Sequence, residues 1–197
     1  MSLFYLLISC EHNDPKTHSF EEQKELYETY CALCHGVNGE GYIAPQANAL
    51  GNQDFLDSAT DAFILDGIID GRPGTKMSPW GEEHGGPLTF EEAQAITEYI
   101  RNWHEGNQAD IHDMIFYGSA SEGLEVYQMY CSGCHGDNGE GASAMSINHP
   151  EFLSEASDGF LWHAISVGRA NTPMGSYANL LSEEDIANLI ALIRSWE

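Results

Sequence analysis

Two pentapeptides of the form Cys-x-x-Cys-His, at residues 31–35 and 131–135, have the residue types and the spacing to do chemistry. This pattern is the attachment signature of c-type haem. Its two thiols can form thioethers with the two vinyl groups of one porphyrin, and the His that follows is then held beneath the iron as an axial ligand. The sequence therefore predicts two covalently bound haems c. Their attachment and axial residues are Cys31, Cys34 and His35 in the first motif and Cys131, Cys134 and His135 in the second.

Each iron needs a ligand on its far side, and a Met thioether there is typical of electron-transfer cytochromes c. Met77 and Met174 follow the two motifs within matching Gly-Arg-x4-Met segments, so we predict that they are the sixth ligands. The rival ligands are Met145, His84, His149 and His163. We expect the other histidines outside the motifs to lie at the surface, namely His12, His18, His104 and His112.

Arg72 and Arg169 belong to the same two segments, in a chain that has only 7 basic residues. Because Arg can bind a carboxylate through two parallel hydrogen bonds, we predict that each contacts a haem propionate. The alternative is an ordinary ion pair at the surface.

The similarity between the two halves runs well beyond the motifs. The offset between matching segments is 100 at residues 36–41, 97 at Met77 and 93 at residues 100–103. The second copy has therefore lost a few loop residues, which we place on the Met side of the haem. A long unit that recurs in this way indicates tandem domains. We predict a leading segment and tether at residues 1–17, domains at 18–105 and 118–197, and a linker at 106–117.

The charge of the chain is strongly negative. Its 197 residues include 31 acidic and 7 basic ones, which gives a net charge of −24, with −13 in residues 1–105 and −11 in residues 106–197. Such a surface disfavours nucleic acid, because that binding needs Lys and Arg to meet phosphate. It favours a protein partner with a basic docking face, unless it serves only for solubility. No run approaches the ~20 apolar residues of a membrane-spanning helix, so none is expected.

Cys10 lies outside both motifs, at the end of an apolar stretch. Residues 7–10 (Leu-Ile-Ser-Cys) resemble a bacterial lipobox, in which Cys10 would become the lipidated first residue and tether the protein to a membrane. A signal peptide starts with positive charge, however, and no Lys or Arg precedes Lys16. The alternative is a trimmed ordinary signal. In either case we expect a periplasmic or other extracytoplasmic protein, because haem is attached to c-type apoproteins outside the cytoplasm.

Apolar spacing and capping residues predict three helices in each half. Gly- and Pro-rich loops with almost no strand signal separate them. The expected helices cover residues 20–30, 60–69 and 89–103 in the first half and residues 121–130, 157–167 and 182–196 in the second.

With the haem motif, the Gly-Arg-x4-Met loop and the C-terminal helix in this order, each half resembles a class I cytochrome c domain. The whole chain resembles the tandem dihaem cytochromes c of bacterial respiratory chains, and the resemblance covers nearly everything after residue 18. It implies an all-α fold of two small helical domains, each wrapped around one haem c. It also implies single-electron transfer between respiratory redox partners, by a free carrier or by a subunit of a complex.

Other functions remain open at this point. With both irons six-coordinate no substrate would find an open site, so we expect a carrier rather than an enzyme. The alternative is a catalytic dihaem enzyme in which one haem, in the second domain, has a labile or different ligand and acts on a small inorganic substrate. A zinc site is disfavoured because 96 residues separate the Cys pairs. A thioredoxin-like pair is disfavoured because no βαβ pattern surrounds either motif.

Overall fold

The computed structural model describes residues 17–197, so Cys10 and the lipobox-like segment lie outside the described residues. Within residues 17–197 the regular elements are helices, and the only strand-like pairing is an isolated bridge between Gly81 and Leu88. The predicted all-α class is therefore confirmed. Among the same residues, no helix has the length and the apolar character needed to cross a bilayer.

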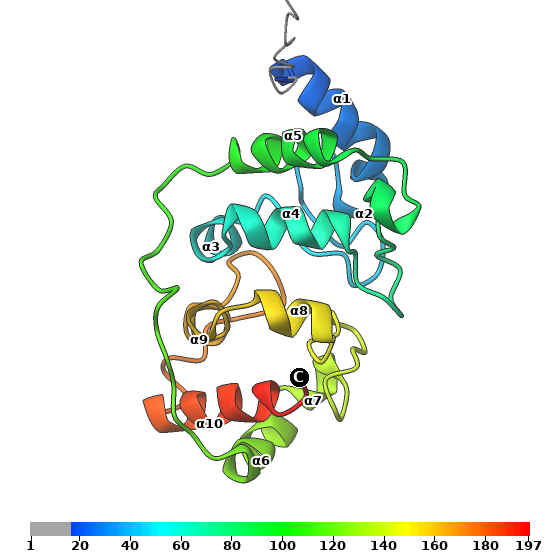
Figure 1. The fold of residues 1–197 in the computed structure, drawn as a ribbon. Helices are drawn as coiled ribbons and strands as arrows, with labels where there is room; N and C mark the ends of the chain where they lie inside the picture. Colours follow the sequence, from blue (N-terminus) through cyan, green and yellow to red (C-terminus); the bar gives the residue numbers. More distant parts are fainter. Residues whose placement is uncertain (1–16) are drawn as a thin grey trace, which may run out of the picture.

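The helices of the two halves correspond in order (Figure 1). Each half has a long helix before its motif, a short helix within the motif, two helices in the middle and one long helix at its end. In the first half these are α1 (Phe20–Tyr30), α2 (Ala32–His35), α3 (Gln53–Ser58), α4 (Asp61–Ile69) and α5 (Phe90–Arg101). The first half also has a 3-10 helix before α5, η1 (Glu82–His84), which has no counterpart among the described residues of the second half. In the second half they are α6 (Ala120–Tyr130), α7 (Ser132–His135), α8 (Pro150–Glu155), α9 (Asp158–Ser166) and α10 (Glu183–Arg194).

Local capping explains where the long helices begin. Ser19 and Thr89 each form a capping box with a Glu three residues on, and Ser182 forms one with Asp185. These side chains satisfy backbone N–H groups that have no partner inside the helix. Thr60 and Ser157 cap α4 and α9 in the predicted way.

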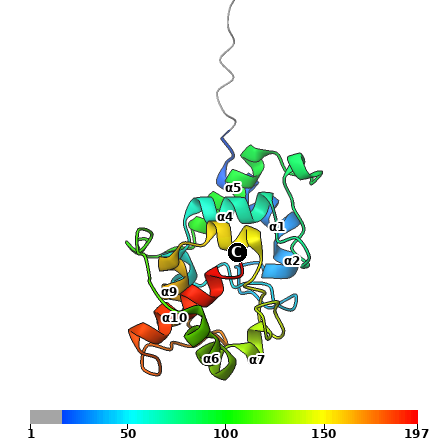
Figure 2. The same ribbon diagram turned by 60° about the horizontal axis from the view of Figure 1, so that its bottom comes forward.

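In each half the first and last long helices cross, α1 against α5 and α6 against α10 (Figures 1 and 2). Gly123 of α6 is buried at its crossing, where a Cβ would overlap the backbone carbonyl of Asn188. At the other crossing Gln23 of α1 donates to Glu98 of α5 at 2.7 Å. The α6–α10 crossing also has a side-chain hydrogen bond, from Asn188 to Glu122 at 3.1 Å, so what sets it apart is the close backbone approach at Gly123.

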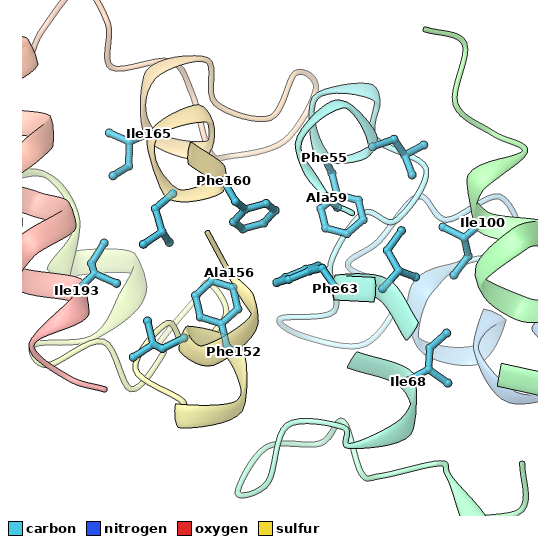
Figure 3. Close-up of a cluster of buried hydrophobic side chains, with 14 of the residues drawn as sticks. Phe55, Ala59, Phe63, Ile68, Ile100, Phe152, Ala156, Phe160, Ile165 and Ile193 are labelled. Carbon is cyan, nitrogen blue, oxygen red and sulfur yellow. The ribbon is translucent and has the colours of Figure 1, made fainter. Parts of the chain in front are cut away.

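The two halves meet through their middle helices. Helix α3 packs on α9 and helix α4 packs on α8, and Figure 1 shows both pairs between the outer helices. Since α3 corresponds to α8 and α4 to α9 at an offset of 97, the contact is close to symmetric about an approximate twofold axis. A buried aromatic cluster fills it (Figure 3). Its members are Phe55, Phe63, Phe152 and Phe160, with centroids 4.7 Å apart for the pair 63 and 160 and 6.4 Å apart for the pair 55 and 160.

Polar contacts also join the halves. The Arg72 guanidinium lies 3.0 Å from the Glu155 carboxylate, with both side chains largely buried. Gln46 donates to the Ala142 carbonyl at 2.6 Å, and Asn52 donates to the Ala170 carbonyl at 2.7 Å. The hydrophobic cluster and these bonds make one continuous core of the two halves.

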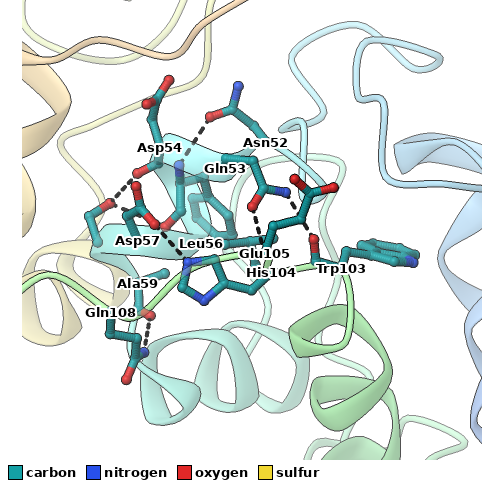
Figure 4. A network of polar contacts seen from close by, with 12 residues as sticks. Asn52, Gln53, Asp54, Leu56, Asp57, Ala59, Trp103, His104, Glu105 and Gln108 are labelled. Atoms are coloured by element: carbon teal, nitrogen blue, oxygen red, sulfur yellow. Dashed lines mark hydrogen bonds and ion pairs between the residues drawn. The ribbon is translucent and has the colours of Figure 1, made fainter.

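The segment after α5 is held against α3 by a polar network (Figure 4). His104 pairs with Asp57 at 2.6 Å, and Gln108 donates to the Ala59 carbonyl at 2.7 Å. The expectation that His104 lies at the surface was wrong, because its side chain is only 5% exposed. The reason is non-local, since Asp57 lies 47 residues earlier in the chain.

Candidate functional site

Both Cys-x-x-Cys-His motifs sit where a long helix ends. Cys31 closes α1 and Cys131 closes α6, with its N–H bonded to the carbonyl of Tyr27 or Tyr127 at 2.8 Å. The chain then turns into α2 or α7, which ends at the motif His. The four motif cysteines are free thiols in this structure.

The two motif histidines each form the same hydrogen bond to a backbone carbonyl. Nδ1 of His35 lies 2.9 Å from the Asn48 carbonyl oxygen, and Nδ1 of His135 lies 2.9 Å from the Met145 carbonyl oxygen. A carbonyl can only accept, so Nδ1 carries the proton and Nε2 keeps its lone pair for a metal. Burial lowers the pKa of both histidines, which favours the neutral imidazole that binds iron.

Two buried tyrosines fix the residue that follows each His. Tyr27 and Tyr127 are fully buried, and each hydroxyl donates to the carbonyl of Gly36 or Gly136 at 2.7 Å. From the sequence these positions would be plain core packing. The signal that could have indicated more is their recurrence four residues before the first Cys of each motif.

The repeated Gly-rich segment after each motif folds back on the His. Gly41 donates its N–H to the His35 carbonyl at 2.7 Å, and Gly141 does so to the His135 carbonyl at 2.6 Å. Gly39 has φ of +68°, and a Cβ there would lie 2.6 Å from the Trp103 ring. Glycine is required at this position because a side chain would be strained and would also collide with the Trp103 ring, just after the end of α5, and with the Gly51 backbone.

The carbonyl partners correct the placement of one loop difference. Asn48 and Met145 do the same task at an offset of 97, so the change from 100 to 97 falls between Gly41 and Asn48, on the His side. Only the change from 97 to 93, within residues 81–88, lies on the Met side. The same contact disfavours Met145 as a rival sixth ligand. Its backbone carbonyl lies against Nδ1 of His135, the ring nitrogen that points away from the predicted iron.

The two Gly-Arg-x4-Met segments form the same turn. Arg72 donates its backbone N–H to the Met77 carbonyl at 2.6 Å, and Arg169 donates to the Met174 carbonyl at 2.7 Å. A Thr hydroxyl, on Thr75 or Thr172, accepts from the N–H of the Met in each copy. Both Met side chains are half-buried. Their ligation of iron stays a prediction, now with a matched local geometry behind it.

The rival histidines have other positions. His84 pairs with Asp70 at 2.7 Å, and His149 is the N-cap residue of α8. His163 is buried, with Nδ1 3.3 Å from the Arg169 guanidinium. His112 was expected at the surface but is half-buried, with its Nε2 lacking a hydrogen-bond partner among the described residues.

The two predicted propionate contacts differ in their surroundings. Arg72 already has a carboxylate partner in Glu155. In the first half, the residue that corresponds to Glu155 at the offset of 97 is Ser58, and it offers Arg169 only a hydroxyl, at 3.2 Å. Arg169 also donates to the carbonyls of Asp54 and Gly168, and forms no ion pair with any residue that the structure describes. Burial lowers its pKa to about 10. A buried guanidinium without a bonded carboxylate fits an anionic group such as a propionate.

The thiols do not have the properties of a redox dithiol. Burial, with a smaller repulsion from the neighbouring motif Cys, raises the pKa of Cys31 to about 12 and that of Cys131 to about 11. Both are protonated at neutral pH, whereas a thioredoxin-like Cys has a lowered pKa. Across residues 17–197 no group of three or more His, Cys, Asp or Glu side chains is arranged to hold a metal ion. Histidine with free Nε2, paired cysteines and a buried Arg together fit haem c.

Comparison with known proteins identifies the family. The sequence pattern described as "Cytochrome C oxidase, cbb3-type, subunit III" matches residues 18–100 and 118–193. The chain belongs to this family. Family membership implies covalently bound haem c. The resemblance to tandem class I cytochromes c is thereby confirmed.

Relatives of this cbb3 subunit III family member include a "Cbb3-type cytochrome c oxidase subunit CcoP" from Azospirillum sp. (strain B510). It is 26% identical over 190 residues, which are 87% of this chain and 60% of the relative. A "Cytochrome bc1 complex cytochrome c subunit" of Corynebacterium diphtheriae is 22% identical over 192 residues, or 89% of this chain and 66% of the relative. The chain thus spans about 60% of the length of the Azospirillum relatives.

A solved structure shares the fold. The "Kuenenia stuttgartiensis reducing HAO-like protein complex Kustc0457/Kustc0458" aligns with a TM-score of 0.56 and 22% identity. The alignment covers 93% of this chain and 98% of that one. At this identity the likeness shows the two-domain helical fold alone.

Proposed function

We propose that this cbb3 subunit III family member is a dihaem c-type cytochrome that passes single electrons between respiratory redox partners outside the cytoplasm. The observation that carries the proposal is the duplicated His geometry, in which a backbone carbonyl 2.9 Å from Nδ1 leaves Nε2 free in both halves. The haem supplies a one-electron couple at iron when it is bound. As a subunit of a larger oxidase or reductase, the chain would relay electrons without binding a substrate itself.

The residues of the chain divide the work of holding two haems. Cys31, Cys34, Cys131 and Cys134 would form the thioethers, and His35 and His135 would be the axial ligands on one side. Met77 and Met174, each in a turn closed by the preceding Arg, would be the ligands on the other side. Arg169 would neutralise a propionate that enters its buried site, and Arg72 would share its charge between a propionate and Glu155.

The surroundings of the protein follow from its chemistry and charge. Haem attachment places the mature chain outside the cytoplasm, and lipidation of Cys10 would add a tether of one acyl anchor without a membrane-spanning segment. With a net charge of −24, the chain would meet partners that have basic docking faces.

Two measurements on haem-loaded protein test the proposal. The mass of the intact chain should exceed that of the polypeptide by two haems, and the double variant Cys131→Ala/Cys134→Ala should carry one. An oxidised spectrum should show the weak sulfur-to-iron band near ~700 nm at the strength of two His/Met haems. One haem in the wild type would contradict the dihaem assignment. A high-spin haem that binds cyanide readily would make the catalytic alternative the better one.

A further inference from the structure

The second half has a recess with apolar and acidic lining residues. It lies between α6, the start of α10 and the segment before α10, and its volume is about 230 Å³. We call it the α6–α10 groove and define it by five of its lining residues, Glu125, Met129, Tyr130, Leu180 and Asp185.

The lining of the groove combines apolar and acidic side chains. Met129 is 72% exposed and Leu180 is 65% exposed, and both line the same recess, so their apolar surfaces are available to a partner. Glu125 and Asp185 stand among the same lining residues. Hydrogen bonds from Ser182 lower the pKa of Asp185, so its carboxylate stays ionised. An apolar recess flanked by carboxylates complements an apolar side chain flanked by Lys or Arg.

The groove adjoins the haem-attachment segment. Tyr130 precedes Cys131 directly, and its carbonyl accepts a hydrogen bond from the Tyr177 hydroxyl at 3.2 Å. The rings of Tyr130 and Tyr177 also pack edge to face, with centroids 6.2 Å apart. A protein seated in the groove would therefore lie beside the second haem.

The first half differs at the matching positions. Thr29 stands where the second half has Met129, and Lys24 stands where it has Leu124. The loop before α5 is also four residues longer than the loop before α10, and it contains the 3-10 helix η1. The two halves share a fold but not this surface.

We propose that the α6–α10 groove is the docking site of a redox protein that presents an apolar side chain between basic residues. The inference rests on the proposed function, since it assigns the second half as the point where electrons enter or leave. The charge of the partner follows from Glu125 and Asp185, and its apolar centre follows from Met129 and Leu180.

The test uses haem-loaded protein and, as a probe, a basic monohaem cytochrome c whose exposed haem edge is ringed by lysines. The double variant Met129→Gln/Leu180→Gln should weaken binding of the probe about tenfold, because it removes the apolar contact without adding charge. Glu125→Lys should slow association at low salt and reduce its dependence on ionic strength. Affinity is measured by titration and the association rate by stopped-flow.

Matched controls lie in the first half. Glu25→Lys makes the same charge change at the corresponding position of α1, and Ile43→Gln removes an apolar side chain of the first half that is 62% exposed. Both should leave affinity within about twofold. The proposal is overturned if the controls weaken binding as much as the groove variants, or if the groove variants bind normally. It is also overturned if the wild type dimerises and the double variant does not, because a second copy then covers the groove.

The failure of this inference can be told apart from failure of the proposed function. Reduction by ascorbate and oxidation by ferricyanide report whether two redox-active haems are present at all. If both haems cycle with these small reagents while the groove variants have no effect, the docking site is wrong and the carrier function stands.

Discussion

At the scale of single residues, the site depends on backbone carbonyls that have no sequence motif of their own. The Asn48 and Met145 carbonyls orient the two histidines, and the tyrosine hydroxyls hold the carbonyls of Gly36 and Gly136. These contacts would keep the imidazoles in place before any haem is attached. Orientation of a ligand by its own hydrogen bonds is what makes an axial His rigid.

Replacing Tyr127 by Phe should therefore cost stability out of proportion to the one oxygen atom removed. The Gly136 carbonyl would lose its 2.7 Å partner in a fully buried place, at a cost of about 1–3 kcal/mol. Chemical denaturation of the holoprotein measures it. The control is Tyr117→Phe, because the Tyr117 side chain is 89% exposed and should change stability little. Equal effects of the two variants would contradict the role given to the hydroxyl.

Glu155 should make stability depend on pH. Burial raises its pKa from 4.5 to about 7, against the attraction of Arg72, and repulsion from Asp66 and Asp70 adds to the rise. The folded protein thus holds this proton more tightly than the unfolded chain does. The contribution of Glu155 protonation to the free energy of unfolding is therefore fully present below about pH 4.5, and it is lost as the pH rises to about 7.

The measurement compares the wild type with Glu155→Gln from pH 4.5 to 8. The variant should gain stability relative to the wild type as the pH rises, because it has no carboxylate to desolvate. A constant difference across this range would show that Glu155 does not bind the proton as described.

At the scale of helices, the crossing of α6 and α10 depends on the absence of one side chain. Gly123→Ala should push the two helices apart, because the new Cβ would meet the Asn188 backbone, and should destabilise the second half by about 1–3 kcal/mol. The variant Gln128→Ala changes an exposed position of the same helix and serves as the control. Thermal unfolding followed at the haem band measures both. If Gly123→Ala were neutral, the crossing would be looser than the structure has it.

At the scale of the whole molecule, we expect the two halves to unfold as one unit, because their buried cores are continuous. Phe63→Ala should therefore destabilise both halves, by about 3–5 kcal/mol in total, since Phe63 contacts three other rings of the interface cluster. Phe90→Ala, at a side chain 52% exposed, is the control. Calorimetry should show one transition in the wild type. Two separate transitions there would mean that the interface is weaker than its packing indicates.

The interface also sets what distinguishes the two haem sites. Arg72 pairs with Glu155 across it, while Arg169 hydrogen-bonds only to neutral groups, because Ser58 occupies the place that Glu155 has in the other half. A propionate would therefore meet an Arg bonded to a carboxylate in the first half and an Arg that only feels the charges of Asp54 and Asp57 in the second. We expect two unequal potentials in a redox titration, and a single unsplit transition would contradict this asymmetry.

The sequence by itself determined the haem motifs, the repeat, the family and the long helices. These features are local, because a capping box or a Cys-x-x-Cys-His run needs only neighbouring residues to be read. Thr60, Thr89, Ser157 and Ser182 all cap helices where the sequence placed the helix start.

Only the tertiary structure decided how the halves meet and what orients each His. Helices α3 and α8 form much of the interface, but each is 6 residues long, too short for apolar periodicity to mark it in the sequence. The partner of His104 lies 47 residues away, and that of Arg72 lies 83 residues away. Contacts at such separations depend on packing of the whole chain, which is why local patterns predicted the chemistry of the site and not its surroundings.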